Sequence, residues 1–211
     1  MTETAQNPKD HLLDAALMHV PFDGWSDTTF QAAIADTGID STVANAVCPR
    51  GSVDLAVAYH KRGDALMIDR MTSEDLTEMK YRDKIAAMVR FRLEVVTDKE
   101  VVRRGTTLFA LPQHAGDGAK LVWGTCDAIW DALGDTSDDV NWYTKRATLS
   151  AVYSSTVLYW LGDTSDGHQA TWEFLDRRID NVMQIEKVKA QVRNSRAPKM
   201  GLPGSWTSPR R

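Results

Sequence analysis

Residues 147–162 restrict the fold more than any other part of the sequence, because no charged side chain occurs among them. The surrounding segment, 140–161, repeats its apolar residues at helical spacing, which predicts one helix. A helix without charge on any face must be covered on nearly every side. A soluble protein can cover it at the centre of a helical bundle, across an oligomer interface or against a bound apolar ligand.

The other segments after residue 10 show the same helical spacing, and no convincing alternating strand pattern occurs. Since 43% of the 211 residues are hydrophobic, the chain can fill a real core, and we predict an all-α fold. A polar stretch after residue 71 separates two parts of the chain. We therefore predict an N-terminal module at 9–71, a C-terminal helical domain at 80–192 and a basic, proline-rich tail at 193–211.

The N-terminal module has the pattern of a helix-turn-helix. Residues 27–37 predict a first helix, with Ser26 placed to cap its N-terminus and Gly38 placed to end it in a left-handed conformation. Residues 41–47 predict a second, shorter helix. This arrangement is typical of transcription regulators.

The second of these helices lacks the side chains that a DNA reader needs. In the major groove, basic residues neutralise phosphates and polar residues contact base edges. The helix 41–47 has no basic residue, and only Asn45 and the nearby Arg50 could contact DNA. The net charge of -4 also differs from the basic surface of most nucleic-acid binders, so DNA binding is not expected.

No catalytic motif occurs in the sequence. It lacks the Gly-x-Ser-x-Gly nucleophile elbow, a glycine-rich phosphate loop and the Glu-x-x-His pair of di-iron proteins. Cys48 and Cys126 have no partner at metal-ligand spacing, and each histidine is expected at the surface or at a helix cap. We predict no catalytic residues, no metal and no cofactor. An enzyme whose site is assembled from distant residues stays open as an alternative.

Two helical features bear on a binding site. The helix expected over 81–96 is amphipathic: Met88 lies on its apolar stripe, and Arg90 and Arg92 are available for the opposite side. In the next helix, Gly105 costs stability relative to alanine. It therefore indicates either a close approach of helices, room for a ligand or a tolerated defect.

The sequence Leu-Gly-Asp-Thr-Ser-Asp occurs twice, at 133–138 and at 161–166. In each copy the glycine, Gly134 or Gly162, is placed to end a helix, and the Asp and Ser that follow can cap the next helix. Calcium binding is the alternative, but the carboxylate spacing of a calcium loop is missing. We interpret both copies as helix ends.

Three motifs resemble one known family. They are Gly24-Trp25, the segment Cys-Pro-Arg-Gly-Ser-Val-Asp-Leu at 48–55, and the segment Asp-Val-Asn-Trp-Tyr-Thr-Lys-Arg at 139–146. Over about residues 9–190 the chain resembles the ubiquinone (coenzyme Q) biosynthesis accessory protein, the ninth of the yeast series. The resemblance implies a tetracycline-repressor-like helical bundle whose C-terminal domain binds ubiquinone, another isoprenoid lipid or a phospholipid. It also implies a partner, the di-iron hydroxylase that acts on demethoxyubiquinone.

The function expected from this resemblance is non-catalytic: to bind an isoprenoid quinone intermediate and present it to the hydroxylase. The candidate lipid-lining residues are Met88, Leu108, Phe109, Trp123, Ile129, Trp130, Tyr153, Val157 and Trp160. Any one of them is also explained by simple core filling. The candidate partner interface is Trp142, Tyr143 and Arg146, with contact to the protein's own core as the alternative for the two aromatics. A tetracycline-repressor-type, ligand-responsive transcription regulator is the alternative function.

The expected assembly rests on the last two helices, and the expected location rests on the two ends of the given sequence. We expect a homodimer through the last two helices, with the small residues Ala147, Ala151 and Ser154 at a close contact. The tail at 193–211 is interpreted as solvated or as in contact with an anionic membrane, which Trp206 favours. Residues 1–10 show no targeting pattern, so we expect either a bacterial cytosolic protein, peripheral at the inner membrane if the tail binds there, or an already processed protein.

Overall fold

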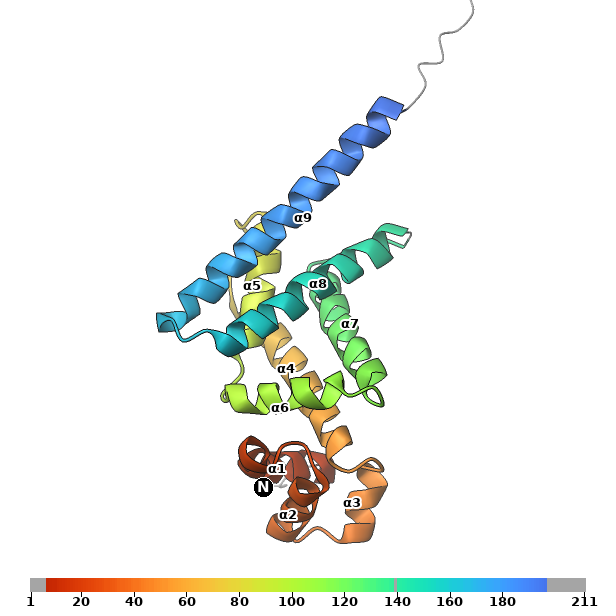
Figure 1. The fold of residues 1–211 in the computed structure, drawn as a ribbon, viewed down its shortest axis with the longest axis vertical. Coiled ribbons are helices and arrows are strands. Elements are labelled where there is room, and N and C mark those ends of the chain that lie inside the picture. Colours follow the sequence, from red (N-terminus) through yellow and green to blue (C-terminus); the bar gives the residue numbers. More distant parts are fainter. Residues whose placement is uncertain (1–6, 139, 197–211) are drawn as a thin grey trace, which may run out of the picture.

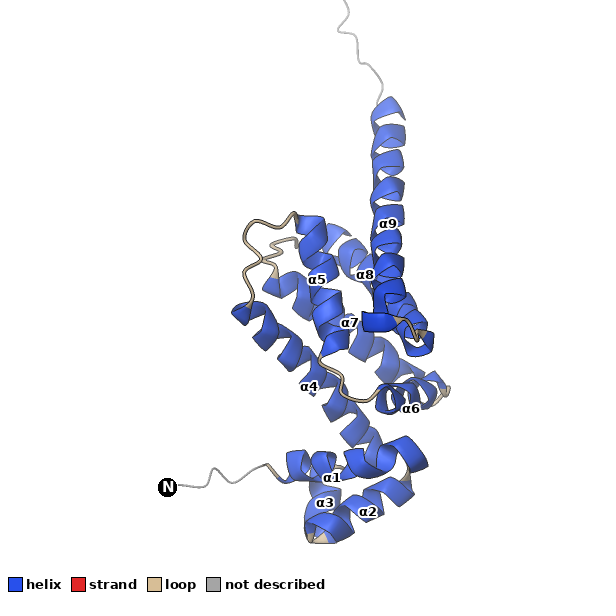
Figure 2. Cartoon of the chain, turned by 90° about the vertical axis from the view of Figure 1, so that its left-hand side faces the viewer, coloured by secondary structure: helices blue, strands red, loops and turns tan. Residues whose placement is uncertain are grey.

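The computed structural model describes residues 7–138 and 140–196, and every regular element within them is a helix (Figures 1 and 2). The predicted all-α fold is therefore confirmed. Residues 197–211, which include Trp206 and most of the expected tail, lie outside the described residues. The elements are α1 (Pro8–Asp23), α2 (Asp27–Thr37), α3 (Ser41–Val47), α4 (Ser52–Ser73), α5 (Tyr81–Glu94), α6 (Lys99–Ala110), α7 (Ala115–Ala132), α8 (Val140–Gly162), the 3-10 turn η1 (Asp166–His168) and α9 (Gln169–Arg196).

Helices α2 and α3 begin and end where the sequence predicts, because local interactions set their ends. The Oγ of Ser26 accepts a hydrogen bond from the backbone N–H of Thr29 at 3.3 Å and so caps α2. Gly38 follows α2 with a φ of 65°, a left-handed conformation that favours glycine. The helix-turn-helix shape predicted for this module is therefore present.

Helix α4 joins two separate hydrophobic cores. Near its start, Leu55 belongs to the core that α4 shares with α1, α2 and α3, whereas Met67, farther along, belongs to the core of the C-terminal bundle. Helix α6 lies across the junction of the two parts (Figure 1). Its Val101 is buried in the first core, and the adjacent Val102 packs against the second. The junction thus brings α4, α6 and the C-terminal bundle together.

Within this chain helix α8 is covered on one side only, so the bundle alone does not provide the nearly complete cover that the sequence predicts. Val152 is buried, but Val140 is 77% exposed and Leu158 is 60% exposed. Much of the charge-free stretch is serine and threonine, whose hydroxyls bond within the helix, as the Ser150 Oγ does to the Arg146 carbonyl at 2.8 Å. A helix surface with such hydroxyl groups can face water although it has no charged side chain. No helix in the described part of the chain is long and apolar enough to cross a bilayer.

Helix α9 packs on α8 and runs back along it in roughly the opposite direction (Figure 1). The loop between them contains the second copy of the repeated sequence, at 161–166. As predicted, its Asp163 caps the next helix by accepting a hydrogen bond from the backbone N–H of Thr171 at 2.9 Å. The first copy, at 133–138, ends α7 at Gly134, which has a φ of 76°. Its Asp135 does not cap the next helix but accepts a hydrogen bond from Lys145 of α8. Its role belongs to the site described below.

Candidate functional site

A cavity of about 320 Å³ lies at the junction between the N-terminal module and the C-terminal bundle. Helices α4, α5, α6, α7 and α8 all contribute to its wall, together with Trp25, which precedes α2. The volume falls at the lower end of the range of about 300–1,000 Å³ for small-molecule sites. Most of the wall is apolar, and its larger apolar residues are Trp25, Leu93, Val96, Val101, Val102, Phe109, Val122, Val157 and Leu158.

Only some of the sequence candidates for lipid contact reach this cavity. Phe109, Tyr153 and Val157 line it. Helical spacing shows which residues point inward but not whether they meet other side chains or open space. The other candidates lie elsewhere: Met88, Ile129, Trp130 and Trp160 are in the C-terminal core, Leu108 packs against the N-terminal core, and Trp123 packs on Trp142.

Glycines make room for the cavity wall. Gly105 lines the cavity on α6, and a Cβ there would lie 3.6 Å from the Nε1 of Trp25, an ordinary van der Waals distance. An alanine would therefore fit at this position, so Gly105 lies at the cavity without being required by a close approach, and a tolerated defect stays open as the alternative. Gly118 of α7 is more restricted, because a Cβ there would lie 2.8 Å from the Cβ of Phe109. That glycine allows α7 to pack against α6.

One part of the wall is polar, and Arg92 is its central residue. The expected position on the solvent side of α5 is wrong, since Arg92 is only 4% exposed. Its Nε donates to the Oδ1 of Asp64 at 2.7 Å, and a terminal nitrogen donates to the carbonyl of His60 at 3.0 Å. Helix α4 can cover this face of α5 because it has Gly63 there, where a Cβ would lie 2.5 Å from the guanidinium.

His60 lies in the same polar wall, although the sequence placed each histidine at a surface or a cap. Its Nε2 is 2.8 Å from the Oγ1 of Thr125, and that hydroxyl donates to the Oδ1 of Asp64 at 2.9 Å. Burial lowers the pKa of His60 to about 4, so the ring is neutral at neutral pH. Gly63, a glycine within α4 between His60 and Asp64, is the sequence signal that could have indicated this contact.

A second region of interest is the aromatic patch, which we define as Trp142 and Tyr143 in the first turn of α8. Tyr143 is 64% exposed, and Trp142 is partly buried. The two rings meet edge to face with their centroids 4.8 Å apart. Trp142 also packs on Trp123 of α7, with the ring centroids 5.8 Å apart. The patch therefore presents one exposed ring that is supported by a second.

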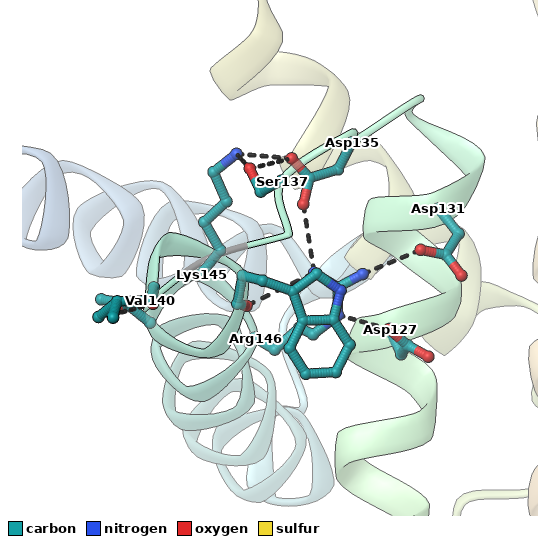
Figure 3. A network of polar contacts seen from close by, with 9 residues as sticks. Asp127, Asp131, Asp135, Ser137, Val140, Lys145 and Arg146 are labelled. Carbon is teal, nitrogen blue, oxygen red and sulfur yellow. Dashed lines mark hydrogen bonds and ion pairs between the residues drawn. The ribbon is translucent and has the colours of Figure 1, made fainter.

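Arg146 supports this patch from below and is not itself at the surface, since it is 1% exposed. Its guanidinium carbon lies 4.0 Å from the centroid of the Trp142 ring, a cation–π contact. It also donates hydrogen bonds to three carboxylates of α7 and the following loop (Figure 3). These are Asp131 at 2.9 Å, Asp135 at 3.2 Å, and Asp127.

The first copy of the repeated sequence completes this network. Asp135 accepts a second charged hydrogen bond from Lys145, with the Nζ at 2.6 Å, and Ser137 accepts another from the same Nζ at 2.7 Å (Figure 3). The hydrogen bond from Lys145 holds the pKa of Asp135 at about 2, so this carboxylate is ionised at neutral pH. The loop is thereby fixed to α8. Within residues 7–138 and 140–196, no group of His, Cys, Asp and Glu side chains is arranged to hold a metal ion.

The helix-turn-helix side chains that could contact DNA are engaged within the protein. The amide of Asn45 donates to the carbonyl of Ser41 in its own helix at 2.8 Å. Arg50 pairs with Asp54 at 2.9 Å and with Asp117 of α7 at 2.7 Å. Both side chains thus have partners within the protein, and α3 adds no basic residue to the surface.

The fold is similar to a solved structure, the TetR transcriptional regulator from Nitrosomonas europaea. The TM-score is 0.66 with 17% sequence identity, and the match covers 82% of this chain and 95% of that chain. The likeness shows a tetracycline-repressor-like fold, as the sequence predicts.

The relatives that sequence comparison identifies share one name. The chain is 34% identical over 186 residues to the mitochondrial ubiquinone biosynthesis protein COQ9 of Drosophila melanogaster, a match that covers 86% of this chain and 57% of that protein. It is 26% identical over 204 residues to the human protein of the same name, covering 92% and 63%. The chain thus spans about 60% of the length of these relatives. The COQ9 family model matches residues 115–186. The chain is therefore similar to the COQ9 family, by the family model over residues 115–186 and by these relatives over most of its own length.

Proposed function

We propose that this chain takes part in ubiquinone biosynthesis as a non-catalytic accessory protein that binds an isoprenoid quinone intermediate and presents it to a di-iron demethoxyubiquinone hydroxylase. The names of its relatives support the pathway. The observation that carries the proposal is the largely apolar cavity of about 320 Å³. Each CH2 group moved from water into such a cavity contributes about 0.8 kcal/mol, so an isoprenoid chain binds there without polar contacts.

The cavity is too small for a long polyprenyl tail and would hold the head of the ligand with the first part of its tail. Leu158 both lines the cavity and is 60% exposed, so it lies at the rim. The rest of the tail would leave past this residue. The exposed, charge-free side of α8 beyond it offers a surface compatible with hydrocarbon.

Lipids that stay bound through native purification test the binding proposal, with mass spectrometry as the measurement. Val157→Trp should fill the cavity and lower the lipid-to-protein ratio about tenfold, because the indole occupies the ligand volume. Val140→Trp is the matched control on the same helix, since Val140 is 77% exposed and remote from the cavity lining. Equal lipid content in the wild type and in Val157→Trp would contradict lipid binding in this cavity.

The aromatic patch is the proposed contact with the hydroxylase. Its support is the exposed Tyr143, held by Trp142 and by the buried Arg146. Exposed aromatics on a rigid base are typical anchors of protein interfaces. Trp142→Lys should abolish hydroxylase capture in a pull-down and leave the helical circular dichroism spectrum intact; unchanged capture would reject the patch.

A transcription regulator is the second candidate function, and the TetR-like fold favours it. Against it, Asn45 and Arg50 are engaged within the protein, so the groove-facing surface of α3 lacks phosphate-neutralising charge. A gel shift at low salt with the upstream region of the gene separates the two candidates. Tight, sequence-specific binding would support the regulator and reject a role restricted to lipid presentation.

We also propose a homodimer through α8 and α9. The support is that two of the three small residues predicted for the contact, Ala147 and Ala151, are exposed on α8, whereas Ser154 is half-buried and lines the cavity. Exposed small residues permit a close helix contact with a second copy. Ala151→Glu should convert a dimer to a monomer in light scattering after size-exclusion chromatography, and a wild-type monomer at all concentrations would reject the dimer.

A further inference from the structure

The charges in the polar wall of the cavity balance one another. Arg92 and Asp64 form an ion pair at 2.7 Å, and the side chains are only 5% and 17% exposed. His60 is kept neutral by burial. Burial also raises the pKa of Tyr59 and of Tyr153, so both phenols keep their protons. The remaining residues that line the cavity carry no ionisable side chain. A ligand therefore meets Arg92 with its charge already balanced by Asp64, a carboxylate that is not itself among the lining residues.

This wall offers hydrogen-bond donors more readily than acceptors. Arg92 uses its Nε and one terminal nitrogen within the protein, and a guanidinium carries further N–H groups. The phenols of Tyr59 and Tyr153 add hydroxyl groups at the same cavity. On the acceptor side, the carboxylate of Asp64 is not among the lining residues, and its Oδ1 already accepts from both Arg92 and Thr125. The ligand atom that complements this polar wall is therefore a hydrogen-bond acceptor.

Packing alone does not explain why charged residues occupy this position. A buried ion pair gains little over apolar residues of similar volume, because desolvation of both charges offsets their attraction. The chain nevertheless has the pair at a cavity, and it has Gly63 where any larger residue would collide with the guanidinium. Buried ionisable groups that face a cavity are typical of binding sites.

We infer that Arg92, with Tyr59 and Tyr153, recognises a neutral head group that accepts hydrogen bonds, such as a quinone carbonyl or a ring ether oxygen, and discriminates against an anionic head. The inference rests on the proposed lipid-binding function. A phosphate or carboxylate would place an uncompensated negative charge against a wall where Asp64 already neutralises Arg92. A neutral oxygen accepts a hydrogen bond without adding charge, and the apolar Val102 and Val157 cover the ring and the start of the tail.

Three probes that share a decyl tail test the inference by isothermal titration calorimetry on the full chain. They are a decyl-substituted dimethoxybenzoquinone, decylbenzene and decyl phosphate. The wild type should bind the quinone about tenfold more tightly than either of the others, the effect of about one hydrogen bond from a charged donor. Decylbenzene measures the apolar contribution alone.

The decisive variant replaces both members of the pair, Arg92→Met with Asp64→Leu, so that no buried charge is left without a partner. Its affinity for the quinone should fall about tenfold, to the level of decylbenzene, whose own affinity should stay within about twofold. Arg90→Met is the matched control, since Arg90 lies on the same helix, is half exposed and does not line the cavity. It should leave the affinity for all three probes unchanged.

A second variant should reverse the order of affinity between the quinone and decyl phosphate. Asp64→Asn leaves the charge of Arg92 without its carboxylate, so decyl phosphate should gain about tenfold and bind more tightly than the quinone. If Asp64→Asn does not fold, the paired variant decides the question alone. Unchanged weak binding of decyl phosphate to a folded Asp64→Asn protein would overturn the charge-balance argument.

The outcomes separate the inference from the proposed function. Equal affinity of the wild type for the quinone and for decylbenzene would overturn polar recognition but leave lipid binding in place. A wild-type preference for decyl phosphate would overturn it in favour of an anionic head. An equal loss of quinone and decylbenzene binding in the paired variant would assign Arg92 to packing only. If none of the three probes binds the wild type, the lipid-binding function itself fails.

Discussion

Two buried arginines serve different purposes in this molecule. Arg92 has one carboxylate partner, Asp64, and faces a cavity, whereas Arg146 has three and packs under an aromatic ring near the surface. With one partner, the charge at the cavity is balanced and the guanidinium keeps donors for a ligand. With three partners, the guanidinium of Arg146 is held in one orientation. The number of partners therefore distinguishes an arginine suited to binding from one suited to positioning.

The surroundings of the carboxylates differ as well. Asp64 is largely buried, but Asp131, bound to Arg146, is well exposed. An exposed carboxylate that loses its arginine is hydrated by water, and a buried one is not. We therefore expect substitutions at the cavity to cost more stability than substitutions under the patch. The following experiments test that order.

The largest effect is expected for Arg92→Met alone. It leaves Asp64 buried without its charged partner, which should lower the free energy of unfolding by about 3–5 kcal/mol. The paired variant, Arg92→Met with Asp64→Leu, should cost less than about 1 kcal/mol. Urea unfolding followed by circular dichroism measures both. If the single variant is no less stable than the paired one, Asp64 is not isolated from water.

A pH effect is expected next, from His60. Its pKa is about 4 in the folded chain and near the ordinary value of 6.5 when unfolded, so the unfolded chain binds the proton first as the pH falls. The free energy of unfolding should therefore be unaffected above pH 6.5 and should fall by up to about 3 kcal/mol between pH 6.5 and pH 4. Urea unfolding of the wild type and of His60→Gln over this range measures it, and the variant should lose this dependence. Equal slopes in the two proteins would show that His60 titrates normally.

A smaller loss of stability is expected for Arg146→Met. It removes the hydrogen bonds to three carboxylates and the contact with Trp142, but Asp127 and Asp131 can turn to water and Asp135 keeps Lys145. The cost should be about 2 kcal/mol. The fluorescence of Trp142 should report a more mobile ring, and hydroxylase capture should fall with it. Rigid fluorescence together with full capture would show that Arg146 does not position the patch.

The smallest effect on stability is expected for Tyr143→Lys. Tyr143 is 64% exposed, so the free energy of unfolding should change by less than about 0.5 kcal/mol. Its effect should appear in hydroxylase capture alone. Val140→Lys, at a still more exposed position of the same helix turn, is the control and should not reduce capture. A similar loss in both variants would point to charge rather than to the aromatic ring.

Features set by neighbours in the sequence could be predicted from it. Both ends of α2 follow from Ser26 and Gly38, whose interactions lie within a few residues of the helix. The all-α fold follows from periodicity. For α8, absence of charge predicts covered faces but not what covers them: within this chain one side is exposed, and serine and threonine hydroxyls bond within the helix.

Features set by distant contacts could not be predicted. Arg92 is a different case: it follows Ile85 by seven residues and Met88 by four, so the helical period places it on the apolar face of α5, and only its charge led to the expectation that it faces solvent. Phe109 and Trp160 both point inward, yet only Phe109 reaches the cavity. Two identical six-residue segments likewise behave differently, since Asp163 caps α9 whereas Asp135 binds Lys145 and Arg146.

Helix α8 carries both ends of the proposed transfer. The patch residue Trp142 lies in its first turn and the rim residue Leu158 in its last turns, and at a rise of 1.5 Å per residue these are about 24 Å apart. An enzyme that is docked at the patch would then lie at a fixed distance from the mouth of the cavity. The ligand would therefore pass directly only to an enzyme whose active-site entrance lies at about that distance from the surface that contacts the patch.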